Sequence, residues 1–299
     1  MLQHGNAAPT PPERVVVMGA GGFVGNAIAT RLERDHLSVL RVGRHDVDLL
    51  ASWAAERLRG LLRPGDVVVA ASALAPCRTA EMLCQNMVMA AALVTACAAP
   101  LAQIVNISSD AVYADSREPL TEASPKAPDS LHGVMHLARE IMFRTAVSAP
   151  LVMLRPSLLY GVADPHNGYG PNRFLRLAER GDPIVLFGNG EERRDHVLID
   201  DVAELAARVI YHRSTGALNV ATGTVTSFRD IADMVARYID RAVPIIDTPR
   251  TQPMPHNGYR PFDTACCRTV FPDFSFTPLP DGLRRTIAGR QALAQEPGS

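Results

Sequence analysis

Two histidines four residues apart, His132 and His136, have side chains suited to proton transfer near neutral pH. An imidazole has an ordinary pKa of about 6.5, so it can both give and take a proton under physiological conditions. If the segment is helical, the spacing places both rings on one face, with Glu140 one turn further on. Metal-ligating histidines share this spacing, but the pair encloses no H-E-x-x-H glutamate and has no obvious further ligand. We therefore expect proton transfer rather than metal binding.

A glycine-rich stretch near the start of the chain has the spacing of a phosphate-binding turn. Residues 15–18, V-V-V-M, form a short β-branched run typical of a strand buried on both faces of a parallel sheet. Gly19, Gly22 and Gly25 follow in the order G-x-x-G-x-x-G, and residues 27–32 then show helical spacing. Free N–H groups and the dipole at such a helix start favour a pyrophosphate. We expect Gly19, Gly22, Phe23, Val24 and Gly25 to bind a dinucleotide; the alternative is a tight strand-to-helix turn without a ligand.

Composition excludes several other classes of protein. With 299 residues and a net charge of −1, the chain gives no sign of a nucleic-acid or acidic-membrane partner. No apolar run approaches the roughly 20 residues that span a bilayer, and the first residues lack the pattern of a signal peptide. Five cysteines without a C-x-x-C pair indicate free thiols. We expect a cytoplasmic protein whose proline-rich residues 1–12 form a loose tail.

The tip of the next predicted strand, residues 37–42, bears on the choice of dinucleotide. In a doubly wound α/β sheet this tip faces the adenosine ribose, where an acidic residue usually selects NAD. Arg41 and Arg44 stand there instead, and guanidinium groups suit a 2′-phosphate. The expected cofactor is therefore NAD(P), with NADP favoured, unless these arginines are simply solvated.

The order of motifs along residues 14–288 resembles that of the extended short-chain dehydrogenases/reductases, the nucleotide-sugar epimerase/dehydratase group. After the glycine loop come S-S-D-A-V-Y (108–113), L-R-P-S-L-L-Y-G (154–161) and the stretch P-I-V-L-F-G-N-G-E-E-R-R-D-H-V-L-I-D-D-V-A (183–203). The resemblance implies an α/β fold with a doubly wound parallel sheet. It further implies an NAD(P)-binding Rossmann domain over residues 13–160 and a smaller C-terminal substrate lobe, mainly residues 161–290, with residues 218–223 returning to the main sheet.

The resemblance also implies roles for individual residues. Ser109 would hydrogen-bond the reacting sugar oxygen. The residues that would line the cofactor, besides the glycine loop and the two arginines, are Asp46, Val47, Ala71, Ser72 and Pro156. The residues that would contact the substrate are Asp110, Tyr113, Asn172, Arg194 and Arg260. Arg194 would face the diphosphate of a sugar nucleotide, and its alternative is a surface ion pair with Asp195.

The sequence departs from the family pattern at the catalytic dyad. Relatives use a tyrosine and a lysine four residues apart, and here His132 and His136 stand at those places, while Lys126 is the only lysine. Three interpretations remain open: His132 is the acid/base with support from His136, the pair binds a metal, or the histidines only pack. We favour the first, as Ser109 and Arg194 still match the family. The expected function is epimerisation or oxidoreduction of a nucleotide-activated sugar by a homodimer; the alternative is a non-catalytic NAD(P)-binding regulatory protein.

Overall fold

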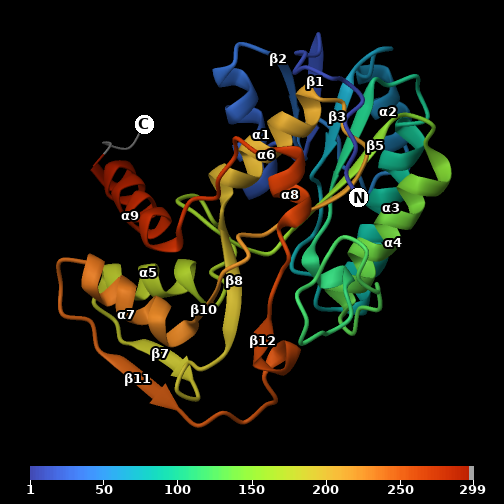
Figure 1. Cartoon of the computed structure of the whole chain (residues 1–299). Coiled ribbons are helices and arrows are strands. Elements are labelled where there is room, and N and C mark those ends of the chain that lie inside the picture. Colours follow the sequence, from blue (N-terminus) through green and yellow to red (C-terminus); the bar gives the residue numbers. More distant parts are fainter. Residues whose placement is uncertain (296–299) are drawn as a thin grey trace.

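The computed structural model describes residues 1–295, and its elements alternate between strands and helices (Figure 1). The strands are β1 (Arg14–Met18), β2 (Ser38–Val42), β3 (Val67–Ala70), β4 (Gln103–Ile107), β5 (Leu151–Pro156), β6 (Leu158–Tyr160), β7 (Ile184–Phe187), β8 (Arg193–Leu198), β9 (Gly216–Val220), β10 (Val225–Ser227), β11 (Ile245–Thr248) and β12 (Tyr259–Arg260). The helices are α1 (Phe23–Arg34), α2 (Ala54–Leu61), α3 (Ala80–Ala96), α4 (Leu131–Ala146), α5 (Pro171–Arg180), α6 (Ile199–Tyr211), α7 (Phe228–Tyr238), α8 (Ala265–Val270) and α9 (Leu279–Gln295), with the short 3-10 turns η1 (Asp110–Val112) and η2 (Pro255–Gly258).

Six parallel strands form the main sheet in the order β2-β1-β3-β4-β5-β9. The strand order reverses between β1 and β3, and a crevice opens at such a point outside the carboxyl ends of the strands. The predicted doubly wound parallel sheet is therefore confirmed. Its reversal point lies directly beside the glycine loop that follows β1.

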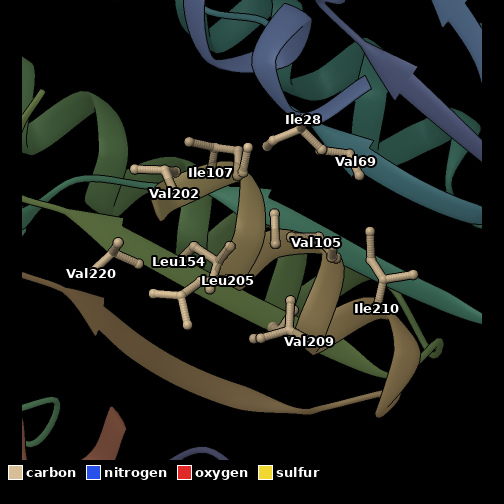
Figure 2. Packing of buried hydrophobic residues seen from close by; sticks show 14 of the residues in the cluster. Ile28, Val69, Val105, Ile107, Leu154, Val202, Leu205, Val209, Ile210 and Val220 are labelled. Atoms are coloured by element: carbon tan, nitrogen blue, oxygen red, sulfur yellow. The ribbon is translucent and has the colours of Figure 1, made fainter. Parts of the chain in front are cut away.

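Helices cover both faces of this sheet, which explains the uninterrupted apolar runs of its strands. Figure 2 shows α1 and α6 packed on one face, where Ile28 and Leu205 meet Val105 and Leu154 of the sheet. On the other face α2, α3 and α4 bury Leu58, Leu93 and Phe143. Each strand is thus buried on both faces, and the residues at its carboxyl end are available to line a site.

A smaller unit lies beside this edge (Figure 1). It contains β6, β8, β10 and β12, the parallel pair β7 and β11, and helices α5, α7 and α9 around a separate core that includes Phe174, Ile231 and Leu283. The chain enters and leaves this unit more than once, because α6 and β9 pack into the main sheet although they lie within residues 161–290. Residues from both units therefore meet along one crevice.

The N-terminal residues are not a loose tail, so that expectation was wrong. Leu2 is 4% exposed, Gln3 forms a β-bridge with Thr215, and the amide of Gly5 donates to His212 O. The His4 ring stacks on His212 at a centroid distance of 4.2 Å. A buried leucine and these backbone bonds outweigh the disorder that the prolines suggested.

Among residues 1–295, no helix has both the length and the apolar character required to span a membrane.

Candidate functional site

Two adjoining cavities follow the carboxyl edge of the main sheet, and most of the predicted site residues line one or the other. The first, of about 530 Å³, runs along Gly19, Arg44, Val47 and Ser72. The second, of about 590 Å³, is lined by residues from both units; they include Phe23, Val24, Gly25, Ser109, Asp110, His132, His136, Pro156, Asn172 and Arg194. Gly22, Ala71 and Ala73 line both cavities. One continuous crevice therefore extends from the tip of β2 to the smaller unit.

The glycine loop has the geometry of a phosphate cradle. Gly19 has φ +86°, a left-handed conformation that favours glycine, and the Gly22 amide donates to Gly19 O at 2.9 Å. A Cβ atom at Gly25 would overlap Gly19 O, so only glycine lets α1 start this close to β1. Gly22 caps α1 without any side-chain hydrogen bond, which leaves the first N–H groups of the helix for a ligand. The loop fits the pyrophosphate of a dinucleotide.

The two arginines at the tip of β2 have different surroundings. Arg41 is held by Glu33, with Nε and Nη2 each 2.7 Å from a carboxylate oxygen, and it also donates to Asn26 and Thr30. Arg44 lines the first cavity, and its side chain is 75% exposed. Arg44, which lies 3.8 Å from Asp48, is therefore more available to a ligand than Arg41, which is committed to α1.

Val47 and Asp46, both expected to line the cofactor, differ in what the structure does with them. Val47 is buried and lines the first cavity. The Asp46 carboxylate accepts the Gly43 amide at 2.8 Å, which fixes the turn between them.

Ser109 and Asp110 lie where β4 ends, at the floor of the second cavity. Ser109 caps the 3-10 turn η1, because its Oγ accepts the Ala111 amide at 3.1 Å. The same hydroxyl donates to Asp110 Oδ1 at 3.3 Å, and Asp110 Oδ2 accepts from Arg260 Nε at 2.9 Å. Arg260 is 1% exposed and also donates to the Asp110 carbonyl, so its guanidinium holds the segment that carries Ser109.

Tyr113 supports the wall behind this floor. Its phenol donates to Asn219 Oδ1 at 2.6 Å and accepts from Arg155 Nη1 at 2.7 Å, and the residue is only 2% exposed. Arg155 in turn makes two 2.7 Å bonds to the Glu140 carboxylate. Tyr113 and Arg260, both expected to contact substrate, therefore have their polar groups used inside the protein; the sequence could not show which distant partners bind them.

His132 and His136 both lie on a helix, α4, which Ser130 caps through the Gly133 amide. Both line the second cavity, and their rings meet edge to face at a centroid distance of 4.7 Å. The Cys77 amide donates to His132 Nδ1 at 3.4 Å, so a neutral His132 carries its proton on Nε2. Asn86, whose carboxamide binds both Leu74 N and Leu74 O, holds the loop that supplies this amide.

Both imidazoles favour the neutral form. Burial lowers the pKa of His132, and the charge of Asp110 opposes that shift only in part. Burial, His132 and Arg139 together hold the pKa of His136 well below its ordinary value, and His136 Nδ1 is buried without a hydrogen-bond partner among residues 1–295.

A metal site at these histidines would need at least one further ligand beside the two imidazoles. Glu140 is fully buried and binds Arg155 and Ser108, so it does not join the two imidazoles. In the described part of the chain, no cluster of three or more histidine, cysteine, aspartate or glutamate side chains is arranged to hold a metal ion.

The smaller unit contributes the remaining predicted residues. Arg194 is 8% exposed and lies 3.3 Å from Glu192 Oε1, whereas Asp195 binds Ser157 and Thr222. The two neighbours therefore do not form the surface pair considered as the alternative. Asn172 bridges Gly161 N and Leu159 O, which secures the loop at the cavity wall.

Sequence reasoning missed two further histidines of the second cavity, His166 and His256. His166 follows Asp164, whose carboxylate accepts the His166 amide. His256 Nδ1 lies 2.5 Å from Asp115 Oδ1. Neither belongs to a recognisable motif, so only the folded chain places them at the site.

Several known proteins resemble this chain in sequence or in fold. A family model for the NAD dependent epimerase/dehydratase family matches residues 15–221. The UDP-glucose 4-epimerase of Mycolicibacterium smegmatis is 31% identical over 121 residues, which cover 40% of this chain but only 38% of that enzyme. The solved UDP-glucose 4-epimerase of Thermus thermophilus, in complex with NAD, superposes with a TM-score of 0.81 at 23% identity over 93% of this chain and 99% of its own. A GDP-L-fucose synthetase from Naegleria fowleri bound to NADP gives a TM-score of 0.80 at 16% identity, with 98% of each chain covered.

Proposed function

The chain belongs to the NAD dependent epimerase/dehydratase family, and from this premise we propose that it epimerises, oxidises or reduces a nucleotide-activated sugar. The observation that carries the proposal is the continuous crevice: a glycine cradle for a dinucleotide opens into a cavity lined by Ser109, His132 and Arg194. Several relatives act on nucleotide sugars by name, and two of the similar structures contain NAD or NADP.

The cofactor would lie along the first cavity and the shared residues Gly22, Ala71 and Ala73. When bound, a nicotinamide supplies hydride exchange at a sugar carbon. The N–H groups at the start of α1 would hold the pyrophosphate. Pro156 and Leu158, which line the second cavity, would exclude water around the reacting end.

Ser109 and His132 would act on the sugar oxygen that gains or loses a proton. In its neutral form His132 presents Nε2–H, so it would donate a hydrogen bond to the oxygen in the way a neutral imidazole polarises a carbonyl. To accept a proton at Nε2, the ring must first move its own proton to Nδ1 and give up the bond from Cys77. A 3.4 Å bond is weak, so this exchange costs little, about 1 kcal/mol.

His136 would tune His132 rather than bind the ribose. It is 6% exposed, and its ring stands perpendicular to that of His132. A second positive charge so close to a protonated His132 is unfavourable. His136 therefore stays neutral and supports the orientation of its neighbour.

The preferred cofactor would be NADP. Arg44 is exposed at the edge of the first cavity, and His45 beside it is also a lining residue; Asp48, which lines the same cavity, is 3.8 Å from Arg44 and does not hold it closely. A guanidinium that is free to turn can meet a 2′-phosphate.

The functional unit would be a homodimer joined through α3 and α4. These two helices pack side by side and leave apolar side chains exposed on their outer surface: Val88 is 50% exposed, Val134 39% and Ile141 48%. Leu131 extends the same surface at 36% exposure. Covering such a surface with a second copy of the chain would remove it from water.

The alternative is a non-catalytic NAD(P)-binding protein. Tyr113 and Arg260 favour this alternative, because the polar groups of both are engaged within the protein and do not face the cavity. A regulatory protein would use the glycine cradle but need no proton transfer.

The experiment that separates these proposals is calorimetry followed by product analysis. Purified protein is titrated with NADPH and NADH, then incubated with UDP-, dTDP- and GDP-sugars while nicotinamide absorbance and sugar products are followed. We expect His132→Ala to bind the dinucleotide normally and to lose turnover by a factor of about 10²–10⁴, the usual contribution of a general acid or base. His212→Gln, a control at the end of α6 that lines neither cavity, should turn over like the wild type. Conversion of no sugar would favour the binding protein, and normal turnover by His132→Ala would remove His132 from the mechanism.

A further inference from the structure

His256 is brought into the second cavity by an unusual turn. His256, Asn257 and Gly258 all have positive φ, at +53°, +52° and +76°. Such values are uncommon in residues other than glycine and persist only where the surrounding structure enforces them. The turn points His256 toward Asp115, which is 141 residues earlier in the chain, while the residue lines the same cavity as Arg194.

Asp115 fixes the tautomer of the ring. His256 Nδ1 lies 2.5 Å from Asp115 Oδ1, and Arg260 Nη1 lies 3.0 Å from both of these atoms. A carboxylate only accepts hydrogen bonds, so the shorter contact requires a proton on Nδ1, and Arg260 Nη1 then donates to Asp115 and not to the ring. That leaves Nε2, which has no hydrogen-bond partner within residues 1–295, as the atom open to a ligand.

Three charged side chains from separate parts of the fold face this ring. Asp115 comes from the loop after η1, Arg260 from β12 and Arg194 from β8. Burial, Arg194 and Arg260 lower the pKa of His256, and the Asp115 carboxylate raises it only in part, so the ring is neutral in the free protein at neutral pH. Glu192 lies 3.3 Å from Arg194 but contacts only one of its terminal nitrogens, which leaves donors for a ligand.

We propose that His256 is a ligand-binding residue that takes up a proton when an anionic oxygen of the ligand binds beside Arg194. The anion would sit between the Arg194 guanidinium and His256 Nε2, and a proton at Nε2 would turn this acceptor into a charged donor. Asp115 stabilises the resulting imidazolium from behind, as carboxylates do for oriented histidines. The inference rests on the proposed function in taking the ligand to be a nucleoside diphosphate sugar, whose diphosphate is the anion.

The sign of the pH dependence follows from linkage. Binding raises the pKa of His256, so the complex holds one more proton than the free protein between the two pKa values. Affinity must then fall as pH rises through that interval, by up to tenfold per pH unit. Above the pKa of the complex the proton is no longer taken up and the dependence disappears.

The test is calorimetric titration between pH 6 and pH 8 with UDP-glucose, dTDP-glucose and GDP-mannose. Their diphosphates are diesters with no titrating group in this range, so any proton uptake belongs to the protein. Repeating each titration in buffers of different ionisation enthalpy counts the protons taken up. Inorganic sulfate, followed through the histidine side-chain NMR signals, is the second probe, because it tests the anion site without a nucleotide.

Wild-type protein should take up close to one proton per bound ligand near neutral pH. As the pH is raised from there toward the pKa of the complex, its affinity for the ligand should fall about tenfold per pH unit. His256→Gln should take up none and show a flat profile, and Asp115→Asn should take up less. His212→Gln, a control at a histidine that lines neither cavity, should behave like the wild type. No proton uptake by the wild type, or equal profiles for wild type and His256→Gln, would overturn the inference. If no sugar nucleotide binds but sulfate still shifts the His256 signal with the expected pH dependence, the proposed function fails while the anion site stands.

Discussion

The buried ion pair between Glu140 and Arg155 gives a quantitative prediction, because it is linked both to the helix of the two histidines and to the segment that carries Ser109. Glu140 lies on α4 with His132 and His136, and it binds Ser108 at 2.7 Å directly before Ser109. Arg155 binds it through two 2.7 Å bonds, and the two side chains are 0% and 2% exposed. Replacing Glu140 with glutamine keeps the shape and leaves the guanidinium charge buried without its partner.

Loss of one member of a buried ion pair typically costs about 3–5 kcal/mol. We expect Glu140→Gln to lose this much free energy of unfolding in urea, and to melt about 5–10 °C lower at this chain length. The matched control is Glu179→Gln. Glu179 binds Arg290 through two 2.6 Å bonds of the same geometry, but these side chains are 29% and 22% exposed. Such a partly solvated pair should contribute about 0–1 kcal/mol.

The same prediction has a pH dependence with a definite sign. Burial alone would raise the pKa of Glu140, but the hydrogen bonds and charge of Arg155 outweigh it and lower that pKa. The pair therefore stabilises the fold fully above the unfolded pKa of about 4.3, and the benefit disappears as pH falls through the lower folded value. The difference between wild type and Glu140→Gln should shrink in acid. If Glu140→Gln and Glu179→Gln lost the same free energy of unfolding at neutral pH, the reasoning would be refuted.

Three further predictions concern binding and assembly. Gly25→Ala should weaken NADPH binding by about 100-fold, or about 2.8 kcal/mol, because its Cβ would overlap Gly19 O. Gly60→Ala on α2, outside the first cavity, has nothing within 4 Å of the new atom and should bind normally in the same titration. Arg44→Ala should lower the affinity for NADPH about tenfold while the affinity for NADH stays within twofold. Arg41→Ala should change the preference for NADPH over NADH less, because Glu33 already holds the Arg41 guanidinium. Equal losses of affinity for both cofactors in Arg44→Ala would argue against a 2′-phosphate contact. Val88→Asp should convert a dimer to a monomer in analytical ultracentrifugation, and a wild type that sediments as a monomer would exclude the proposed interface.

The local part of the site could be predicted from the sequence. Glycine is required at position 19 by the backbone conformation and at position 25 by contacts within one strand-to-helix turn. Both requirements depend only on residues close by in the sequence, so the motif can be identified from the sequence. The two-sided burial of the main strands likewise follows from their short apolar runs. The same local signals misjudged residues 1–12, where contacts with α6 and β9 decide the outcome.

Which charged groups pair was decided by the tertiary structure alone. Arg260 reaches Asp110 across 150 residues of sequence and His256 reaches Asp115 across 141, and nothing in the intervening residues marks either pairing. Tyr113 and Arg194 illustrate the same point, since one is turned into a buried network and the other lines the cavity. Periodicity in the sequence tells which face of an element is buried. The role of an ionisable side chain is set instead by the distant group that the fold brings within about 3 Å of it. The reason is that charge interactions and desolvation depend on distance in space and not on position in the chain.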